Sequence, residues 1–318
     1  MNRIKQLLFT LGVLVALSFS SQSAVATEKI VFANVGWTGV TIKTKTVIKL
    51  LDQLGYEAEE KMLSVPITYT ALSQGDVDVF LGNWMPSMKT IADKFFENGT
   101  VIKYKANMPG AKYTLAAPSY VVDAGLKHFD DLVKYGDKLD WKIYGIEVGN
   151  DGNKIIKYMI DNDMHGMGKF ELIPSSEATM LLQVGSYIKN KDWLVFLGWS
   201  PHSMNVRYDM KYLDGSTSET FGENNGTATV YTNLRKGFVE DNANLARFFK
   251  NLYFPINMMN EAMLTMHENK EVKHLQAGLH WIKANPEMVK EWFDGVKTAD
   301  GKPAYPVIAD YLESVNVM

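Results

Sequence analysis

Hydrophobic and polar residues follow one another along the first third of the chain in the pattern of a parallel sheet covered by helices. Strands are predicted at 30–35, 57–63 and 77–81, and apolar residues recur at helical spacing over 40–54. Gly55 follows this helical segment, and Pro66 begins a second one over 66–73. The pattern therefore predicts a βαβαβ unit with parallel strands.

The same pattern restarts further along the chain. Strands are predicted at 142–147, 170–173 and 194–197, with helices at 154–160 and 177–188 between them. From about Asn242 onward the periodicity is mostly helical, and no low-complexity linker separates the two units. We therefore expect an α/β protein whose two lobes enclose a cleft, and clefts of this kind bind ligands.

The N-terminus has the three parts of a secretory signal peptide. Arg3 and Lys5 precede an apolar run over 7–17, and an A-x-A cleavage site ends at Ala26. The run is about half of the roughly 20 residues that a transmembrane helix needs. The sequence thus predicts a cleaved leader over 1–26 and an exported, periplasmic protein.

Charge and cysteine content narrow the functional classes. Lys and Arg total 33 against 36 Asp and Glu, and no basic cluster marks a nucleic-acid surface. The chain has no cysteine, so neither a disulfide nor a lipid anchor at the cleavage site is expected. A large apolar core must then stabilise the exported chain, which we expect to be a monomer.

Three tryptophans occupy the same position relative to the predicted strands. Trp37, Trp84 and Trp199 each follow a strand and a Gly or Gly-Asn, at the edge that faces the crevice of an α/β sheet. They could be ordinary core residues, but their shared position favours an aromatic cage. A cage suits a trimethylammonium group, which cannot hydrogen-bond and gains roughly 0.5–2 kcal/mol from each ring. The tryptophans without this context are expected to pack in the core: Trp141, Trp193, Trp281 and Trp292.

Several longer motifs resemble those of one protein family. They are LSVPITYTAL (63–72), DVDVFLGNWMP (76–86), GAKYTLA (110–116), IYGIEVGNDGN (143–153), VFLGWSPH (195–202) and TVYTN (229–233). In this order they resemble the choline-binding periplasmic proteins of the glycine betaine/choline group of ABC importers. The resemblance implies a type II periplasmic binding protein, with two lobes joined by a hinge around the ligand.

The resemblance also assigns parts and residues. Lobe I is expected to comprise 27–110 and 207–318, and lobe II 111–206. Trp37, Trp84, Tyr113 and Trp199 would form the cage, and Asn150 would contact the other end of the ligand. The partners would be an ABC permease and its ATPase on separate chains, and no cofactor is expected.

One position departs from the family pattern. The choline binders have an aspartate after the VGWT motif, which accepts a hydrogen bond from the choline hydroxyl, whereas this chain has Gly39. Gly39 would expose its own amide and that of Val40 at a helix N-terminus, which favours anions. His202 could bind a ligand carboxylate or could only orient its loop. We therefore expect a zwitterion such as glycine betaine to bind at least as well as choline.

Other ligands and functions stay open. Trimethylamine N-oxide and dimethylsulfoniopropionate would also suit a cage, and a choline-specific binder is the main alternative. An enzyme is not expected, because G-x-S-x-G and H-E-x-x-H are absent and the histidines lack the i,i+4 spacing of a helical metal site. The remaining alternative, an exported structural protein, would bind no small solute.

Overall fold

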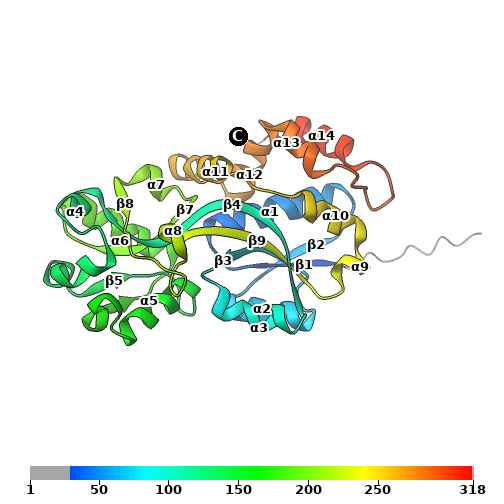
Figure 1. Cartoon of the computed structure of the whole chain (residues 1–318). Coiled ribbons are helices and arrows are strands. Elements are labelled where there is room, and N and C mark those ends of the chain that lie inside the picture. Colours follow the sequence, from blue (N-terminus) through cyan, green and yellow to red (C-terminus); the bar gives the residue numbers. More distant parts are fainter. Residues whose placement is uncertain (1–28, 317–318) are drawn as a thin grey trace, which may run out of the picture.

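The computed structural model describes residues 29–316, so the predicted signal peptide lies outside the described residues. Within 29–316, no helix combines the length and the apolar character that a membrane crossing requires. The predicted α/β fold is confirmed: helices cover both faces of a strongly curved mixed sheet (Figure 1).

All strands belong to a single sheet with the order β2-β1-β3-β9-β4-β7-β5-β6, and β8 pairs with β4 off this path. The strands are β1 (Ile30–Asn34), β2 (Ala58–Met62), β3 (Val79–Met85), β4 (Val101–Pro118), β5 (Lys142–Tyr144), β6 (Glu171–Ile173), β7 (Val195–Ser200), β8 (Met210–Tyr212) and β9 (Thr227–Arg235). Two similar units lie on either side of the central strands β9 and β4.

Each unit is a parallel βαβαβ arrangement, as the sequence predicts. In lobe I, β1 lies between β2 and β3, and the connections are α1 (Thr38–Gln53) and α2 (Val65–Gln74). In lobe II, β5 lies between β6 and β7, with connections α5 (Asp151–Asp161) and α6 (Glu177–Asn190). The two lobes thus repeat one topology without repeating a sequence.

Two long antiparallel strands join the lobes, and the sequence pattern does not predict them. Strand β4 pairs with β9 over its first part and with β7 and β8 over its last residues (Figure 1). The predicted lobe boundary at 110/111 falls at a register shift inside β4. The second boundary, at 206/207, stays a prediction, and the pairing of β8 with the end of β4 favours a return crossing after β8, in β9.

Helices enclose both lobes. In lobe I, α2 and α3 (Lys89–Glu97) lie on one face of the sheet, and α1 with the C-terminal helices lies on the other (Figure 1). The remaining helices are α4 (Ser119–Asp123), η1 (Phe129–Leu139), η2 (Met164–Lys169), α7 (Met204–Arg207), α8 (Glu223–Gly226), α9 (Phe238–Asp241), α10 (Ala243–Asn251), α11 (Ile256–Glu268), α12 (His274–Lys283), α13 (Pro286–Trp292) and α14 (Ala304–Ser314).

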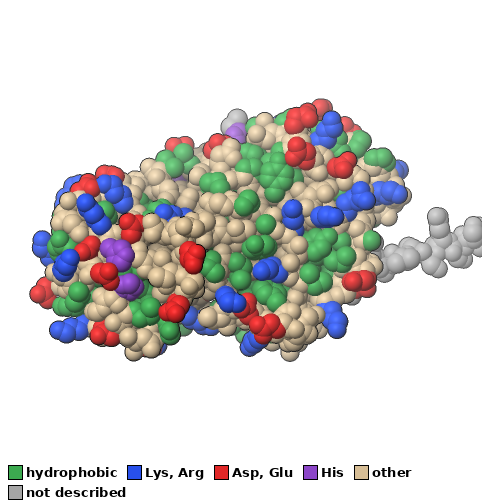
Figure 2. All heavy atoms as spheres, viewed as in Figure 1, with side chains coloured by type: hydrophobic (Ala, Val, Ile, Leu, Met, Phe, Trp, Pro, Cys, Tyr) green, Lys and Arg blue, Asp and Glu red, His purple; other side chains and the backbone are tan. Residues whose placement is uncertain are grey.

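Apolar burial stabilises each lobe. The fully buried side chains include Phe32, Leu50, Phe80 and Phe249 in lobe I and Phe129, Ile156, Val184 and Phe196 in lobe II. Basic and acidic side chains are interspersed over the surface in view (Figure 2). This face therefore has none of the concentrated positive charge that nucleic acid requires.

Candidate functional site

A cavity lies where the ends of β3 and β7 meet the start of α1. It contains about 490 Å³ of atom-free space and is partly open to solvent. Its lining residues come from both lobes and are mostly apolar: Trp37, Gly39, Val40, Lys43, Trp84, Met108, Tyr113, Ile146, Asp151, Trp199, Pro201, Met259 and Met263. A mostly apolar lining with a few polar groups is typical of a small-molecule site.

Strand register brings three aromatic rings together. Tyr113 on β4 lies directly opposite Trp199 on β7, and their ring centroids are 6.3 Å apart in an edge-on arrangement. Trp84 on β3 lies 5.7 Å from the same tyrosine ring. The fully buried Phe221 packs edge-on against Tyr113 and supports it. Contrary to the sequence prediction, Trp84 and Trp199 lie within the last residues of their strands rather than after them.

Trp37 adds a fourth ring to the aromatic lining. It is the N-cap residue of α1, and its indole Nε1 donates a hydrogen bond to Glu147 Oε1 at 2.9 Å. Glu147 belongs to lobe II, just after β5. Burial raises the pKa of Glu147, while the hydrogen bonds from Trp37 and Asn150 oppose the rise. The bond between Trp37 and Glu147 holds the two lobes together at the cavity.

A second contact between the lobes is centred on Glu177, the first residue of α6. Its carboxylate accepts hydrogen bonds from the Thr38 amide, at 3.2 and 3.3 Å, and from the Thr38 hydroxyl. It also lies 3.2 Å from Nε2 of His202. Because Nδ1 of His202 accepts the amide N–H of Met204, the ring proton lies on Nε2 and is donated to Glu177. We call this group of Thr38, Glu177 and His202 the latch.

The hydrogen bonds of the latch favour the ionised form of the Glu177 carboxylate. Burial raises the pKa of Glu177, but the hydrogen bonds from His202 and Thr38 more than offset this, so the net pKa is lowered. Helix α1 has no acidic residue in its own first turn. Glu177 therefore supplies negative charge to the α1 N-terminus from the opposite lobe.

Asn150 has a structural position beside the cavity rather than in its lining. It is the N-cap residue of α5, and its Oδ1 accepts hydrogen bonds from the amides of Gly152 and Asn153 and from the Tyr113 hydroxyl at 3.0 Å. Its Nδ2 donates to Glu147 and to the next residue. Asn150 therefore fixes Tyr113, whose pKa is raised well above its usual value mainly by burial.

Asp151, the first residue of α5, has an unusual environment. Asp151 is among the lining residues of the cavity and is only 1% exposed. Oδ1 accepts a 3.2 Å hydrogen bond from Asn150, whereas Oδ2 has no partner among residues 29–316. Burial raises the pKa of Asp151 to about 6, although the nearby Ser87 hydroxyl opposes the rise. That hydroxyl donates its own hydrogen bond to the Trp84 carbonyl.

Lys43 is the basic residue in the lining. It is fully buried, and its Nζ donates to the carbonyl of Leu81 at 2.6 Å and contacts Asn107 Oδ1 at 3.4 Å. The pKa of Lys43 falls to about 7 because burial removes water from the ammonium group. In the sequence Lys43 stands between the apolar residues Val40 and Val47, and the structure places it on the buried face of α1.

The structure brings most of the predicted site residues together. Trp37, Gly39, Val40, Trp84, Tyr113 and Trp199 line the cavity. Asn150 and His202 do not, because their polar atoms bond to protein groups; His202 packs its ring against Trp199 with centroids 5.1 Å apart. This arrangement favours the alternative in which His202 orients its loop.

The expected binding of a ligand carboxylate at the start of α1 is not supported. The Glu177 carboxylate already accepts the Thr38 amide at this N-terminus, and a second carboxylate would meet its repulsion. This contact opposes an anion site at the neighbouring amides of Gly39 and Val40, and the expected preference for a zwitterion stays a prediction.

The sequence analysis missed several lining residues. Asp151 stands inside the GNDGN motif and could have been found as an acidic residue at the start of a helix. Lys43 could have been noticed as a charge on an apolar helix face. No local pattern distinguishes the others: Met108, Ile146, Pro201, Met259 and Met263.

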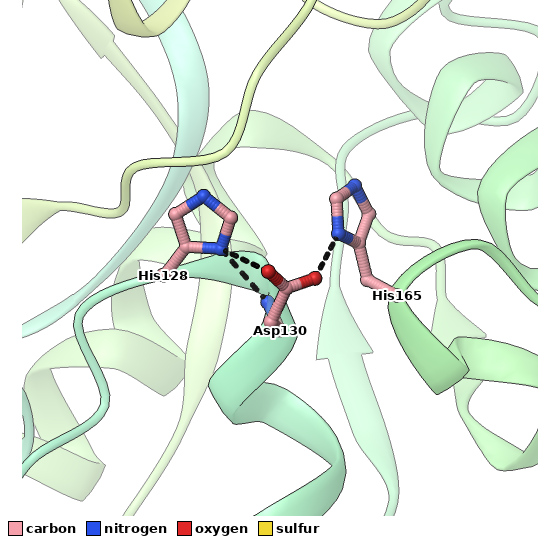
Figure 3. A group of neighbouring side chains, drawn as sticks. All are labelled: His128, Asp130 and His165. Carbon is pink, nitrogen blue, oxygen red and sulfur yellow. Dashed lines mark hydrogen bonds and ion pairs between the residues drawn. The ribbon is translucent and has the colours of Figure 1, made fainter.

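Within residues 29–316, one group has the composition of a metal site. Figure 3 shows His128 and His165 on either side of Asp130, with both Nδ1 atoms directed at its carboxylate. The distances are 3.0 Å from His128 and 2.5 Å from His165. Nδ1 of His128 also accepts the Asp130 amide, which makes it a helix cap. The helix cap at His128 and the hydrogen bond between His165 and Asp130 account for the positions of these residues, and none of the three lines the cavity.

Comparison with known proteins gives a consistent result. Residues 28–284 match the family model OpuAC, the substrate binding domain of ABC-type glycine betaine transport systems. The structure is similar to that of an ABC-transporter choline binding protein in complex with choline, with a TM-score of 0.86 and 42% identity over 89% of this chain and 98% of that chain.

Two sequence relatives each match part of the chain. A protein of Chromohalobacter salexigens called ORF1 is 46% identical over 147 residues, which are 46% of this chain and 95% of that protein. The glycine betaine/carnitine transport binding protein GbuC of Listeria monocytogenes is 29% identical over 65% of this chain and 66% of its own length.

Proposed function

Because the chain belongs to the family of substrate-binding domains of ABC-type glycine betaine transport systems, we propose that its aromatic cavity captures the quaternary-ammonium group of the transported solute. One observation carries this assignment to the cavity: four aromatic side chains, from both lobes, converge on the same space. They are Trp37, Trp84, Tyr113 and Trp199. A methylated ammonium offers no N–H donor, so ring faces and methyl burial must supply its affinity.

The contacts between the lobes support capture by closure. The Trp37–Glu147 bond and the latch join residues of lobe I and lobe II directly beside the cavity. Opening must break these bonds, and closing buries the ligand. We propose that β4 and β9, which run through both lobes, bend during this motion.

The wider role follows from this mechanism. The protein would act as a monomer, because the residues of one chain line the whole cavity. It would work in the periplasm after removal of residues 1–26, and would deliver its ligand to an ABC permease and ATPase on separate chains. A non-transport structural role would leave the convergence of rings on a cavity without a purpose.

Titration calorimetry of the protein with choline, glycine betaine, trimethylamine N-oxide, dimethylsulfoniopropionate and carnitine tests the proposal. At least one methylated ligand should bind and should raise the unfolding temperature, because a ligand that binds only the folded state stabilises it. Ammonium and ethanolamine, which lack the methyl groups, serve as controls and should bind at least tenfold more weakly. If no methylated compound binds, the proposed function is wrong.

A further inference from the structure

We propose that Asp151 is a specificity-determining residue that pairs with the bound cation and makes the cavity prefer ligands with net positive charge, such as choline, over zwitterions, such as glycine betaine. This inference rests on the proposed function, because it concerns the same cavity. The preference is the opposite of the one expected from Gly39, for which a zwitterion would bind at least as well as choline.

Within residues 29–316, the carboxylate of Asp151 has one oxygen without a hydrogen-bond partner. Asp151 is 99% buried, lines the cavity, and its Oδ2 lacks a hydrogen-bond partner throughout the described part of the chain. Buried polar atoms in native proteins are nearly always paired, so an unpaired carboxylate oxygen on a residue that lines an apolar cavity requires a partner. A ligand can supply either a cationic methylammonium face or a hydroxyl donor.

Helix capping does not account for the buried carboxylate of Asp151. Asn150 already caps α5 by accepting from the amides of Gly152 and Asn153. Asp151 adds negative charge to the first turn, which is favourable near a helix N-terminus. An exposed carboxylate in that turn would give the same benefit without the cost of burial, so its buried position beside the cage needs another reason.

The charges near the cavity also favour a ligand with net positive charge. Asp151 acts directly on the cage, since its charge contributes to the raised pKa of Tyr113. Glu147 and Glu177 lie at the same side of the cleft and bind Trp37 and Thr38. A carboxylate carried by a zwitterion would therefore enter a region that already holds three acidic side chains.

Lys43 is the competing feature, because a buried ammonium could attract the anionic end of a zwitterion. Its Nζ, however, donates to the Leu81 carbonyl and contacts Asn107, which are interior groups of lobe I. Its ammonium is therefore already bound within the protein, in contrast to Oδ2 of Asp151.

The experiment compares choline and glycine betaine by calorimetry at equal ionic strength, on the wild type and on Asp151→Asn. In the wild type, choline should bind at least tenfold more tightly than glycine betaine. Asp151→Asn should weaken choline binding at least tenfold and glycine betaine binding by less than threefold. The control Asp161→Asn removes the same charge from the exposed end of the same helix and should change neither affinity.

Each other outcome has a defined meaning. Equal weakening of both ligands by Asp151→Asn, or no change in either, would overturn the inference while the proposed function stands. Wild-type protein that binds glycine betaine as tightly as choline would also overturn it, and this arm needs no variant to fold. Asp151→Ser, which suits the first turn of a helix, provides a second neutral variant. Absence of binding by both ligands would instead count against the proposed function.

Discussion

Two buried carboxylates in lobe II occupy equivalent positions and have opposite surroundings. Glu177 is the first residue of α6, and Asp151 is the first residue of α5, which is the matching helix of the same βαβαβ unit. Glu177 accepts bonds from the amide and hydroxyl of Thr38 and from His202. Asp151 accepts one bond from Asn150 and leaves Oδ2 unpaired within residues 29–316.

The difference shows how the number of donors decides the state of a buried acid. Burial raises the pKa of both groups, but only at Glu177 do the hydrogen bonds outweigh it. Glu177 is thus satisfied by the protein and holds the lobes together. Asp151 stays unsatisfied until something enters the cavity, which fits a group that acts on the ligand. Five experiments should separate these roles.

Removal of the latch should have the largest effect. Glu177→Ala leaves the Thr38 amide and the His202 Nε2–H buried without their acceptor, which should cost about 2–4 kcal/mol in the closed form. Because closure is common to all ligands, calorimetry should show choline and glycine betaine weakened by similar factors, about 30-fold or more. Glu171→Gln, on the exposed edge of the same lobe, should change neither. A selective loss of choline would contradict the separation of roles.

Loss of a cage ring should be the next largest effect, and it should also be unselective. Trp84→Ala and Trp199→Ala each remove a ring that lines the cavity and that, in the proposed function, would contact the methyl groups shared by every ligand. Affinity should fall roughly 10- to 100-fold, or about 1.4–3 kcal/mol. Trp193→Ala is the matched control, since that ring packs against Tyr135 away from the cavity. Binding of both cage variants within twofold of wild type would contradict the cage.

Acid should weaken the binding of choline more than that of glycine betaine. The groups that act on Asp151 include Glu147, which raises its pKa, and Lys154, which lowers it. A bound cation favours the ionised carboxylate, so choline affinity should fall as the pH drops through about 6, by up to tenfold per pH unit. Titrations between pH 5 and 7.5 measure this slope, and Asp151→Asn should flatten it. An equal slope in the variant would assign the titration to another group.

The same raised pKa makes a prediction for the ligand-free protein. An acid whose pKa rises on folding stabilises the fold below its unfolded value, near 3.8, and loses that contribution as the pH rises through about 6. At pH 7.5 the ionised Asp151 is therefore a cost, and Asp151→Asn should raise the free energy of unfolding by about 1–3 kcal/mol. Urea denaturation measures the change. A large destabilisation would indicate a structural role instead.

Gly39→Asp should have the smallest effect. An added Cβ would lie 3.3 Å from the methyl group of Met263, a flexible side chain that can shift slightly. The new carboxylate would join Glu177 and Asp151 in a region that is already negative, so little further preference for choline is gained. Paired titrations should show a change in the choline to glycine betaine ratio of less than about 1 kcal/mol. A larger shift would show that Gly39 itself sets the specificity.

The sequence by itself determined the local elements and much of the cage. Periodicity identified both βαβαβ units, because burial of one helix face or one sheet face leaves a regular pattern in the chain. The glycines before Trp37, Trp84 and Trp199 marked the strand ends that face a crevice, and family resemblance added Tyr113. These features depend on neighbours within a few residues or on long motifs, and both can be recognised in the amino-acid sequence alone.

The tertiary structure alone decided how the strands cross and which polar groups are free. The pairing of β4 with β9 depends on residues more than 100 positions apart, and Met259 and Met263 reach the cavity from a helix over 140 residues beyond Tyr113. The sequence pointed to Asn150 and His202, yet both bond to protein groups, while the neighbouring Asp151 keeps a free oxygen. Whether a polar side chain is available to a ligand depends on every donor that surrounds it in space, and only the folded chain brings those donors together.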